Sequence, residues 1–290
     1  MKDLNQITVI GLGLLGGSIA SGVLRCFSGV KVVGYSHRAS TRARARELAV
    51  AGEVVDSLEQ SVCGADLVIL ATPISMFEDI FGRIGKFLQD GCIVTDVGST
   101  KVLPHRWAQN MLPRRVHYVG SHPIAGSEKR GVDFARDDLY DRAMCILTAT
   151  QKTNRQAVRM LEEFWSKLGC LVKLMKPAEH DRIFANVSHV PHVTAAALTN
   201  ATNGREMKFA GKGFLDTSRI ASGPANIWAD VLLTNTGNIS KGIDKVIAEL
   251  HKLKKAVDSK DREQIEKLLT AAKKKREKLI DYKIEQKEIV

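Results

Sequence analysis

The sequence predicts a two-part protein in which an α/β domain with a doubly wound parallel sheet is followed by an all-α domain. Three observations support this fold class. Short runs rich in β-branched residues alternate with amphipathic segments as far as about residue 176. A glycine-rich turn joins the first of these runs to a helical pattern. Beyond Pro177 the β-branched runs give way to longer segments with helical periodicity.

The first part contains seven runs that we expect to be buried strands. Amphipathic stretches such as Ser75–Leu88 and Arg155–Leu168 lie between most of them. Strands that alternate with helices are typical of a parallel sheet covered on both faces. The expected strands are Ile7–Ile10, Lys31–Tyr35, Leu67–Ala71, Cys92–Val97, His117–Gly120, Met144–Leu147 and Leu171–Leu174.

The second part is expected to contain helices only. The segment His189–Ala201 is rich in Ala, Val and Thr around its circumference, which suits a helix enclosed by other helices. Ile239–Val257 and Arg262–Lys287 are long and amphipathic. The boundary falls near Lys176, so the expected domains span residues 1–176 and 177–290.

The composition is that of a globular protein, because 44% of the 290 residues are hydrophobic and 26% are charged. No apolar stretch approaches the roughly 20 residues that cross a bilayer, and the N-terminus does not resemble a secretory signal. The five cysteines are scattered and form no C-x-x-C pair. This argues against a disulfide framework and a zinc site, and we expect a cytoplasmic protein.

The net charge of +11 is compatible with nucleic acid, a membrane surface or small anions as partners. Much of the excess lies near the C-terminus, in Lys252–Lys255 and Lys273–Arg276. A solvated helix face explains these basic residues better than nucleic-acid binding, because no aromatic residues are interleaved with them. We therefore expect small anionic ligands, and neither nucleic acid nor membrane.

The first expected strand leads directly into Gly11-Leu-Gly13-Leu-Leu-Gly16-Gly17-Ser18, after which a helical pattern begins. This order is the fingerprint of a Rossmann dinucleotide-binding turn, and a glycine-rich turn without a ligand is the alternative. Gly11 permits the tight turn, Gly13 lets the backbone approach the pyrophosphate, and Gly16 lets helix and strand pack closely. The expected cofactor-binding residues here are Gly11, Leu12, Gly13, Leu14, Leu15 and Gly16.

The residues after the second strand bear on the choice between NAD and NADP. NAD-preferring sites place a carboxylate there to accept hydrogen bonds from the ribose hydroxyls. This chain has Ser36-His37-Arg38 instead, with Arg42 and Arg44 nearby. Hydroxyl and guanidinium donors suit a 2′-phosphate, although loop arginines are often only solvated. The sequence favours NADP over NAD, with Ser36, His37 and Arg38 as contacts.

Ligands of doubly wound sheets gather at the carboxyl ends of the strands. Thr72 and Pro73 are expected beside the cofactor for this reason. His122 follows the expected strand His117–Gly120, and from there it could take a hydroxyl proton as hydride leaves the same carbon. A structural histidine explains that position nearly as well. The polar clusters at these strand ends are Ala71–Pro73, Asp96–Lys101 and Gly120–Glu128.

A set of motifs extends in one order along nearly the whole chain. It comprises G-L-G-x-x-G-G-S from Gly11, A-T-P from Ala71, D-V-G-S-T-K from Asp96, S-H-P-I-A-G-S-E from Ser121, Glu179-His180-Asp181, Ser188-His189-Val190-Pro191-His192, Asp216–Ala221, Pro224 and Trp228. The set resembles the prephenate/arogenate (cyclohexadienyl) dehydrogenase family. Its H-P-I-A-G-S-E and S-H-x-P-H blocks are together specific to that family.

The resemblance implies an NAD(P)-dependent oxidoreductase of tyrosine biosynthesis and a homodimer formed through the helical part. Such enzymes oxidise and decarboxylate prephenate or arogenate, giving 4-hydroxyphenylpyruvate or tyrosine. The resemblance also implies that His122 assists deprotonation of the ring hydroxyl, that Ser99 contacts the same region and that Arg219 holds a substrate carboxylate. The remaining expected pocket residues are His180, Ser127, Glu128, His192 and Trp228.

Two features depart from the family pattern. The family often has Ser-Asp-Pro where this chain has Ser222-Gly223-Pro224, which puts the geometry of that loop in question. The acidic residue after the second strand is also absent, which agrees with a preference for NADP.

His189 and His192 lie three residues apart, a spacing that could place both on one helix face as metal ligands, but the pattern is not H-E-x-x-H. An anion pocket with Arg219 explains the histidines more simply, and we expect no metal.

Two other functions remain open at this point. One is a related two-domain dehydrogenase of the β-hydroxyacid dehydrogenase or pyrroline-carboxylate reductase type, of which the former typically has a catalytic lysine on a helix. The other is a protein that senses the dinucleotide without chemistry. A sensor predicts cofactor binding without turnover, and it leaves the combination of His122 and Arg219 unexplained.

Overall fold

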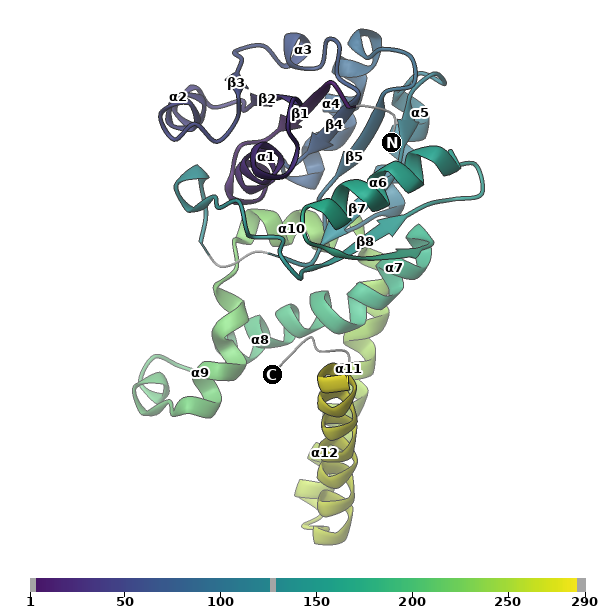
Figure 1. Cartoon of the computed structure of the whole chain (residues 1–290). Coiled ribbons are helices and arrows are strands. Elements are labelled where there is room, and N and C mark those ends of the chain that lie inside the picture. Colours follow the sequence, from purple (N-terminus) through teal and green to yellow (C-terminus); the bar gives the residue numbers. More distant parts are fainter. Residues whose placement is uncertain (1–3, 126–128, 286–290) are drawn as a thin grey trace. The chain divides into compact units, whose positions relative to one another are not determined.

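The computed structural model describes residues 4–125 and 129–285, and it has the fold class that the sequence predicts (Figure 1). The main sheet has six parallel strands in the order β3-β2-β1-β4-β5-β6. The strand order changes direction between β1 and β4, where doubly wound sheets bind dinucleotides. The strands are β1 (Gln6–Ile10), β2 (Lys31–Tyr35), β3 (Glu53–Val54), β4 (Leu67–Leu70), β5 (Ile93–Asp96) and β6 (His117–Tyr118).

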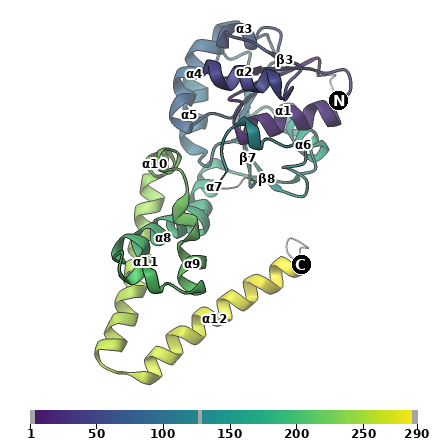
Figure 2. The ribbon, with the colours of Figure 1, turned by 90° about the vertical axis from the view of Figure 1, so that its left-hand side faces the viewer.

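Alternate residues of the central strands pack against opposite layers of helices. In β4, Leu67 and Ile69 belong to the core that contains α1 and α6, whereas Val68 and Leu70 belong to the core that contains α4 and α5. The sheet is therefore buried on both faces, which explains the unbroken apolar runs in the sequence. Figure 2 shows these two helix pairs on opposite sides of the sheet. The covering helices are α1 (Leu14–Cys26), α2 (Ala39–Glu47), α3 (Leu58–Ser61), α4 (Phe77–Ile84), α5 (Val102–Met111) and α6 (Arg155–Lys167).

The last expected strands form a second sheet instead of extending the first. β7 (Gly120–Pro123) pairs antiparallel with β8 (Met144–Thr148), which pairs parallel with β9 (Leu171–Met175). The run expected as one strand, His117–Gly120, is thus divided between β6 and β7. A parallel pair needs a long crossover. The described residues between β7 and β8 contain only the 3₁₀ turn Val132–Phe134, so these strands pair antiparallel.

Polar side chains fix the second sheet to the first. The hydroxyls of Thr95 in β5 and Ser121 in β7 are 2.7 Å apart, and both side chains are fully buried. The indole Nε1 of Trp165 in α6 donates to the same Ser121 oxygen at 3.1 Å. Because buried hydroxyls need partners, these contacts fix the position of β7, the strand that carries His122.

The all-α part begins with a continuous helical path. α7 (Pro177–Phe184) passes through a π-helical turn, Ala185–His189, into α8 (Val190–Ala201). Such turns occur frequently at functional sites, and this one carries His189. The other helices are α9 (Lys212–Ser218), α10 (Ala225–Thr234), α11 (Thr236–Asp258) and α12 (Arg262–Glu285), and the 3₁₀ turns outside β7–β8 are Ile74–Met76, Gly85–Phe87, Glu206–Phe209 and Arg219–Ser222.

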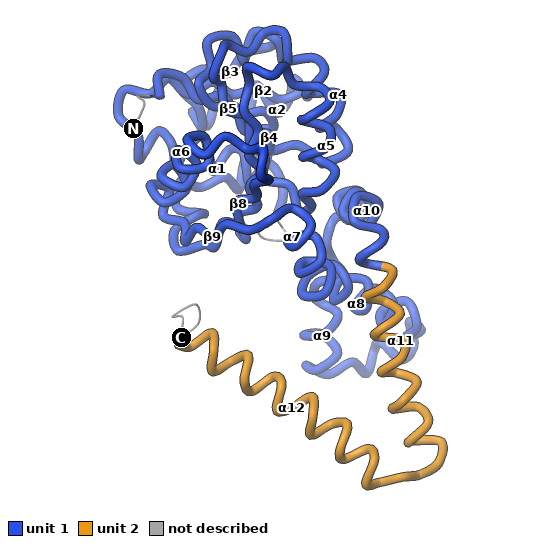
Figure 3. The backbone as a smooth tube through the Cα atoms, turned by 90° about the vertical axis from the view of Figure 1, so that its right-hand side faces the viewer, with its two compact units in different colours: residues 1–239 blue, residues 240–290 orange. Residues whose placement is uncertain are grey.

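The chain forms two compact units, residues 1–239 and residues 240–290 (Figure 3). The first unit contains both sheets and the helices α7 to α10, and the second contains most of α11 together with α12. This division differs from the expected domain boundary near Lys176, which stays a prediction. Within the described ranges, no helix combines the length and apolarity required to cross a membrane.

Candidate active site

The turn between β1 and α1 brings backbone N–H groups to the carboxyl edge of the main sheet. Gly11 has a φ of +101°, and a Cβ there would lie 2.5 Å from the carbonyl oxygen of Ala71, so only glycine fits. A Cβ at Gly16 would overlap the Gly11 carbonyl oxygen, so glycine lets α1 lie close to the strand. A Cβ at Gly13 would meet nothing within 4 Å. This side of the turn is therefore open to a pyrophosphate.

The N-terminus of α1 is prepared for an anion. The helix begins at Leu14 with no side-chain cap and no acidic residue in its first turn. Its first N–H groups lack intrahelical partners, and a negative charge there would be stabilised by the helix dipole. Leu12 is fully buried and packs on Gly34 of β2, while Leu14 and Leu15 are half-buried. These residues can therefore serve a dinucleotide mainly through their backbone.

The loop after β2 is held in place by one arginine. Nη1 of Arg42 donates to the backbone oxygens of Ser36 at 2.7 Å and His37 at 3.2 Å. Nε of the same side chain donates to Oδ1 of Asp56 at 2.6 Å. Arg42 is therefore used to shape the loop, and its guanidinium is already paired with a carboxylate.

The other two arginines of this region differ in their partners. Arg44 forms ion pairs with Asp133 and Glu47, at 2.6 and 2.9 Å. Arg38 is exposed and has no hydrogen-bond or ion-pair partner within residues 4–125 and 129–285. Of the three guanidinium groups considered for a 2′-phosphate, Arg38 is the one left available.

A small cavity of about 30 Å³ lies next to the glycine turn. Its lining includes Gly11 after β1, His37 after β2 and Thr72 after β4. These three residues, which follow three different strands and were each expected at the cofactor, therefore lie close together. Thr72 and the adjacent Pro73 are both half-buried. The rest of the lining is Ile10, Tyr35, Leu58, Met76, Asp79, Ile80 and Arg83.

His122 lies within β7, and the expectation that it follows the end of a main-sheet strand is wrong. Its backbone pairs with Ile146 of β8. β6 leaves the main sheet after Tyr118, so the next residues join the second sheet. The imidazole is half-buried, and its centroid is 4.8 Å from that of the Phe184 ring. The second sheet, fixed to the first through Ser121, therefore positions His122.

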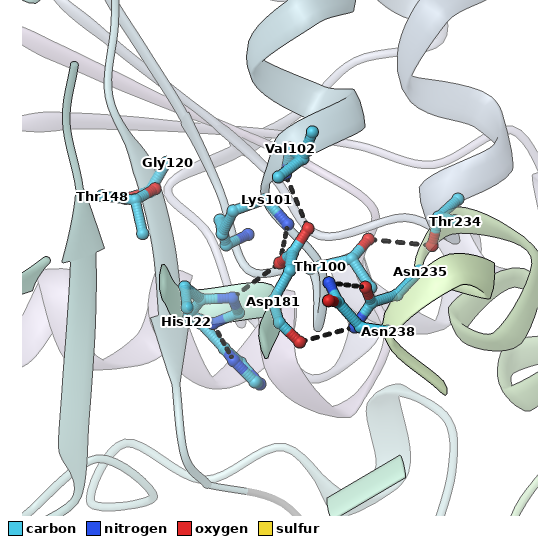
Figure 4. Close-up of polar contacts among 12 residues, drawn as sticks. Thr100, Lys101, Val102, Gly120, His122, Thr148, Asp181, Thr234, Asn235 and Asn238 are labelled. Atoms are coloured by element: carbon cyan, nitrogen blue, oxygen red, sulfur yellow. Dashed lines mark hydrogen bonds and ion pairs between the residues drawn. The ribbon is translucent and has the colours of Figure 1, made fainter. Parts of the chain in front are cut away.

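A chain of hydrogen bonds extends from His122 into the protein (Figure 4). Nδ1 of His122 is 2.9 Å from Nε2 of His180, and Nδ1 of His180 is 2.8 Å from Oδ1 of Asp181. The Asp181 carboxylate accepts from two backbone N–H groups at the start of α5, those of Lys101 at 2.7 Å and Val102 at 2.9 Å. Three side chains from β7 and α7 and the N-terminus of α5 thus form one network.

The imidazoles of this network are neutral at neutral pH. Burial lowers the pKa of His122 well below its ordinary value of 6.5, and the charge of Lys101 lowers it further. Burial, together with positive charges including that of Lys101, lowers the pKa of His180 to about 2. A neutral His122 has one unprotonated ring nitrogen and can therefore accept a proton.

A buried ion pair, for which the sequence predicted no role, lies close to these histidines. Lys101 and Asp96 are both fully buried, and the Lys101 ammonium is paired with Oδ1 of Asp96. The hydroxyl of Tyr118 donates to the other carboxylate oxygen at 2.6 Å. Buried charges need hydrogen-bond partners, and the ammonium and both carboxylate oxygens of this pair each have at least one. The signal was present in D-V-G-S-T-K, which starts with Asp96 and ends with Lys101.

His192 and Trp228 stack face to face, with ring centroids 3.5 Å apart and planes inclined by 9°. A Cβ at Gly223 would overlap Nε1 of Trp228 and lie 3.0 Å from Cε1 of His192. The glycine that replaces the family's aspartate therefore makes room for this stack. Burial lowers the pKa of His192 against the opposing effect of the Ile220 backbone, and its Nδ1 has no partner among the described residues.

His189 lies beside the aromatic stack, a placement that the sequence did not predict. Its ring meets Trp228 edge to face at 6.2 Å, and its Nδ1 is 3.3 Å from Nδ2 of Asn235. Burial lowers the pKa of His189 to about 4, while the Asp181 charge and the Ser99 backbone raise it. Ser99 itself is half-buried on the loop after β5.

Arg219 begins a 3₁₀ turn that packs on α8, the helix that carries His192. Its side chain is exposed, and it has no hydrogen-bond or ion-pair partner in the described part of the chain. The guanidinium is therefore available to an anionic ligand. No contact joins it directly to His122 within the described residues. The predicted residues Ser127 and Glu128 lie outside those residues.

Two family models match consecutive parts of the chain. One, described as "Prephenate dehydrogenase, nucleotide-binding domain", matches residues 20–174. The other, described as "Prephenate dehydrogenase, dimerization domain", matches residues 176–271. The chain belongs to the prephenate dehydrogenase family. It is therefore an oxidoreductase with a nucleotide-binding domain, and its cofactor is a nicotinamide dinucleotide.

Known members of the prephenate dehydrogenase family resemble this chain along most of its length. A prephenate dehydrogenase of Bacillus subtilis is 36% identical over 96% of this chain and 76% of its own length. A cyclohexadienyl dehydrogenase of Zymomonas mobilis is 32% identical over 90% of this chain and 91% of its own. The crystal structure of prephenate dehydrogenase from Aquifex aeolicus with hydroxyphenyl propionate and NAD+ is 31% identical, with a TM-score of 0.89 over 96% of this chain and 99% of that one.

Two further features of the chain bear on the chemistry of the site. Within residues 4–125 and 129–285, no group of three His, Cys, Asp or Glu side chains is placed to hold a metal ion. The five cysteines are free thiols.

Proposed function

We propose that this enzyme oxidises and decarboxylates prephenate or arogenate on the route to tyrosine, with transfer of a hydride to NAD(P)+. The observation that carries the proposal is a neutral imidazole, His122, on the strand fixed beside the carboxyl edge of the dinucleotide-binding sheet. The names of the Bacillus and Zymomonas relatives support the substrate class, as does the aromatic acid bound to the Aquifex protein.

The reaction proceeds through hydride transfer, proton transfer and decarboxylation. The ring carbon loses hydride to the nicotinamide, which is the chemistry that the cofactor supplies. His122 accepts the proton of the hydroxyl on that carbon, which becomes acidic as the carbon gains carbonyl character. The bond to the ring carboxylate then breaks, its electron pair makes the ring aromatic, and carbon dioxide leaves. The chain must bind the anion, align it, accept one proton and exclude water.

We assign the remaining predicted residues to the substrate pocket. Arg219 holds the side-chain carboxylate of the substrate through two guanidinium N–H groups. The guanidinium is available for this contact because it has no partner among the described residues. Ser99 contacts the hydroxyl region, and the stacked pair His192 and Trp228 forms an apolar wall. Ser127 and Glu128 are retained as pocket residues on the family resemblance.

We propose that NADP is preferred over NAD. No carboxylate follows β2 directly, and the Ser36 hydroxyl, His37 and the unpaired Arg38 lie beside the N-terminus of α2, which favours a phosphate. Because Arg42 and Arg44 are paired with carboxylates, Arg38 is the arginine that we assign to the 2′-phosphate. An Arg38→Ala variant is expected to raise the Kd for NADP about tenfold, the loss of one charged hydrogen-bonding partner, and to leave NAD binding unchanged.

We also propose a homodimer with a dinucleotide-binding domain over residues 1–176, a helical substrate and dimerisation domain over 177–290, and a cytoplasmic location. The dimerization-domain match supports the association. Large apolar side chains are exposed in the helical part of the first unit, an arrangement typical of interfaces. They include Val187, Leu198, Phe209, Leu215 and Leu233. Light scattering at micromolar concentration should give twice the mass of 31.8 kDa.

The decisive experiment is an initial-rate matrix of prephenate and arogenate against NAD+ and NADP+. Turnover of one or both substrates, faster with NADP+, is expected. Binding of the dinucleotide without turnover in any of the four combinations would instead favour a sensor, or a dehydrogenase of another substrate class.

A further inference from the structure

We propose that His180 and Asp181 are positioning residues that hold His122 in one tautomer, with Nδ1 protonated and Nε2 free to accept the substrate's hydroxyl proton. The inference rests on the proposed function, which makes His122 the proton acceptor. It also revises the expectation that His180 lines the substrate pocket, because both of its ring nitrogens are occupied by His122 and Asp181.

The network is anchored at Asp181, whose side chain is 1% exposed. Both carboxylate oxygens accept backbone N–H groups at the start of α5, a helix of ten residues. Burial raises the pKa of Asp181, while these two N–H groups and the Lys101 charge lower it. Nδ2 of Asn235 donates to the backbone oxygen of Asp181 at 2.7 Å and fixes the residue further. The site is therefore built for a carboxylate in one fixed position.

The carboxylate determines where each proton of the network lies. Oδ1 of Asp181 can only accept, so Nδ1 of His180 carries a proton. A neutral His180 then has an unprotonated Nε2, which can only accept from Nδ1 of His122. A neutral His122 with a protonated Nδ1 has its lone pair on Nε2. In the opposite tautomers, Nε2 of His122 and Nε2 of His180 would carry the protons. The unprotonated Nδ1 of His180 would then face Oδ1 of Asp181, and two lone pairs would repel each other.

Packing prevents the rings from escaping this arrangement. The His180 side chain is fully buried, and its ring stacks on Phe184 at 4.5 Å with an angle of 27°. The ring of His122 contacts the other two, at 5.1 Å from His180 and 4.8 Å from Phe184. Rotating either imidazole by half a turn would break a buried hydrogen bond without replacing it, which is unfavourable.

The network works by orientation instead of by moving a second proton. When the substrate's hydroxyl proton passes to Nε2, His122 becomes an imidazolium whose Nδ1–H still donates to His180. His180 keeps its own proton on Nδ1, toward Asp181, and the new charge is balanced at a distance by that carboxylate. When carbon dioxide leaves, the electron pair of the broken bond reaches the ring oxygen, and the proton on Nε2 returns to that phenolate oxygen, which leaves His122 neutral again. A catalytic base is oriented in the same way by the aspartate of a Ser-His-Asp triad.

The first test uses the wild-type protein. Nitrogen-15 NMR of histidine-labelled enzyme distinguishes protonated from unprotonated ring nitrogens, and the His122→Asn spectrum identifies the signals of His122. We expect a protonated Nδ1 and an unprotonated Nε2 for His122 at pH 7. A protonated Nε2, or an equal mixture of the two tautomers, overturns the inference whether or not the enzyme accepts prephenate.

The second test compares three variants that bind the dinucleotide normally. His180→Phe removes the acceptor but keeps a ring, and we expect kcat to fall about 10²- to 10⁴-fold, the usual contribution of general-base catalysis. His180→Gln keeps an acceptor oxygen opposite Nδ1 of His122 and should recover at least about tenfold of that loss. His105→Asn is the control, because this half-buried histidine bonds Thr148 and not His122, and its kcat should stay within about twofold of wild type.

Two results of these variants contradict the inference. One is a His180→Phe enzyme with kcat within about threefold of wild type. The other is a His180→Gln enzyme no faster than His180→Phe, which would indicate a purely structural role. A wild-type enzyme inactive with both substrates and both cofactors would instead defeat the proposed function, and the NMR result would then decide the tautomer alone.

Discussion

The dinucleotide end and the histidine end of this enzyme are built in different ways. The glycine turn is made from consecutive residues, and its chemistry lies in the backbone, where Gly11 and Gly16 exclude any side chain. The histidine end joins β7, α7 and the start of α5, so the rings of His122 and His180 are hydrogen-bonded although 58 positions separate them in the sequence. The first depends on local chain geometry, whereas the second depends on how the second sheet and α7 pack.

The largest effect is expected at the histidine end. A His122→Asn variant keeps a side chain capable of hydrogen bonding but loses the base, so kcat should fall about 10²- to 10⁴-fold. Dinucleotide affinity, measured by fluorescence titration, should not change, because the glycine turn is untouched. Turnover close to wild type would show that the proton goes elsewhere.

The glycine end should respond in the opposite way. In Gly11→Ala a Cβ must enter a left-handed conformation beside the Ala71 carbonyl. Backbone strain of about 1–3 kcal/mol is expected, and the Kd for the dinucleotide should rise about 10- to 100-fold. The tautomer of His122 in the NMR spectrum should be unaltered. Unchanged dinucleotide affinity would mean that the turn does not bind the phosphates.

A third variant probes the anion clamp at the histidine end. Arg219→Lys keeps the charge but loses the paired donors of the guanidinium. We expect KM for the substrate to rise about tenfold, with the Kd for NADP constant. An Arg114→Lys variant, on an exposed loop before β6, is a matched control that should leave both values unchanged. Equal KM values for the two variants would remove Arg219 from the pocket.

The smallest effect is expected at Gly223, where this chain departs from its family. In Gly223→Asp the new side chain must displace the Trp228 indole from its stack on His192. An aromatic pair is worth about 0.5–1.5 kcal/mol, so KM for the substrate should rise about 2- to 10-fold. Tryptophan fluorescence should change as well. An identical KM and spectrum would mean that the stack plays no part in substrate binding.

The main elements of the fold could be predicted from the sequence because they follow from local patterns. Each of the seven expected strands contains residues that form a strand in the structure. A short, apolar, β-branched run between two helical segments rarely adopts any other secondary structure. The two-residue strand β3 was missed because so short a segment has no periodicity. The division of His117–Gly120 between β6 and β7 was also not predicted. Strands of both sheets contain the same residue types, and β8, the strand that pairs with β7, lies some 25 positions later in the sequence.

The candidate site could be predicted only in part for the same reason. His122 and the glycines belong to motifs that can be recognised locally. The role of His180 and Asp181 depends on which atoms they face, and as a dipeptide near a helix start they look like ordinary polar residues. The pairing of Arg42 with Asp56 likewise depends on the turn that follows β3. Sequence patterns identify chemical groups, whereas their hydrogen-bond partners are set by tertiary packing.

The most direct test of the central claim, that a half-buried, neutral His122 accepts the proton, is the pH dependence of kcat/KM for the substrate that the wild-type enzyme turns over. This quantity reports the pKa of the free enzyme's base. Because burial places the pKa of His122 well below 6.5, the base stays unprotonated as the pH falls. We predict that the profile stays flat as the pH falls from about 8 through 6.5, the ordinary pKa of histidine. A tenfold loss per pH unit that begins near pH 6.5 would contradict the account.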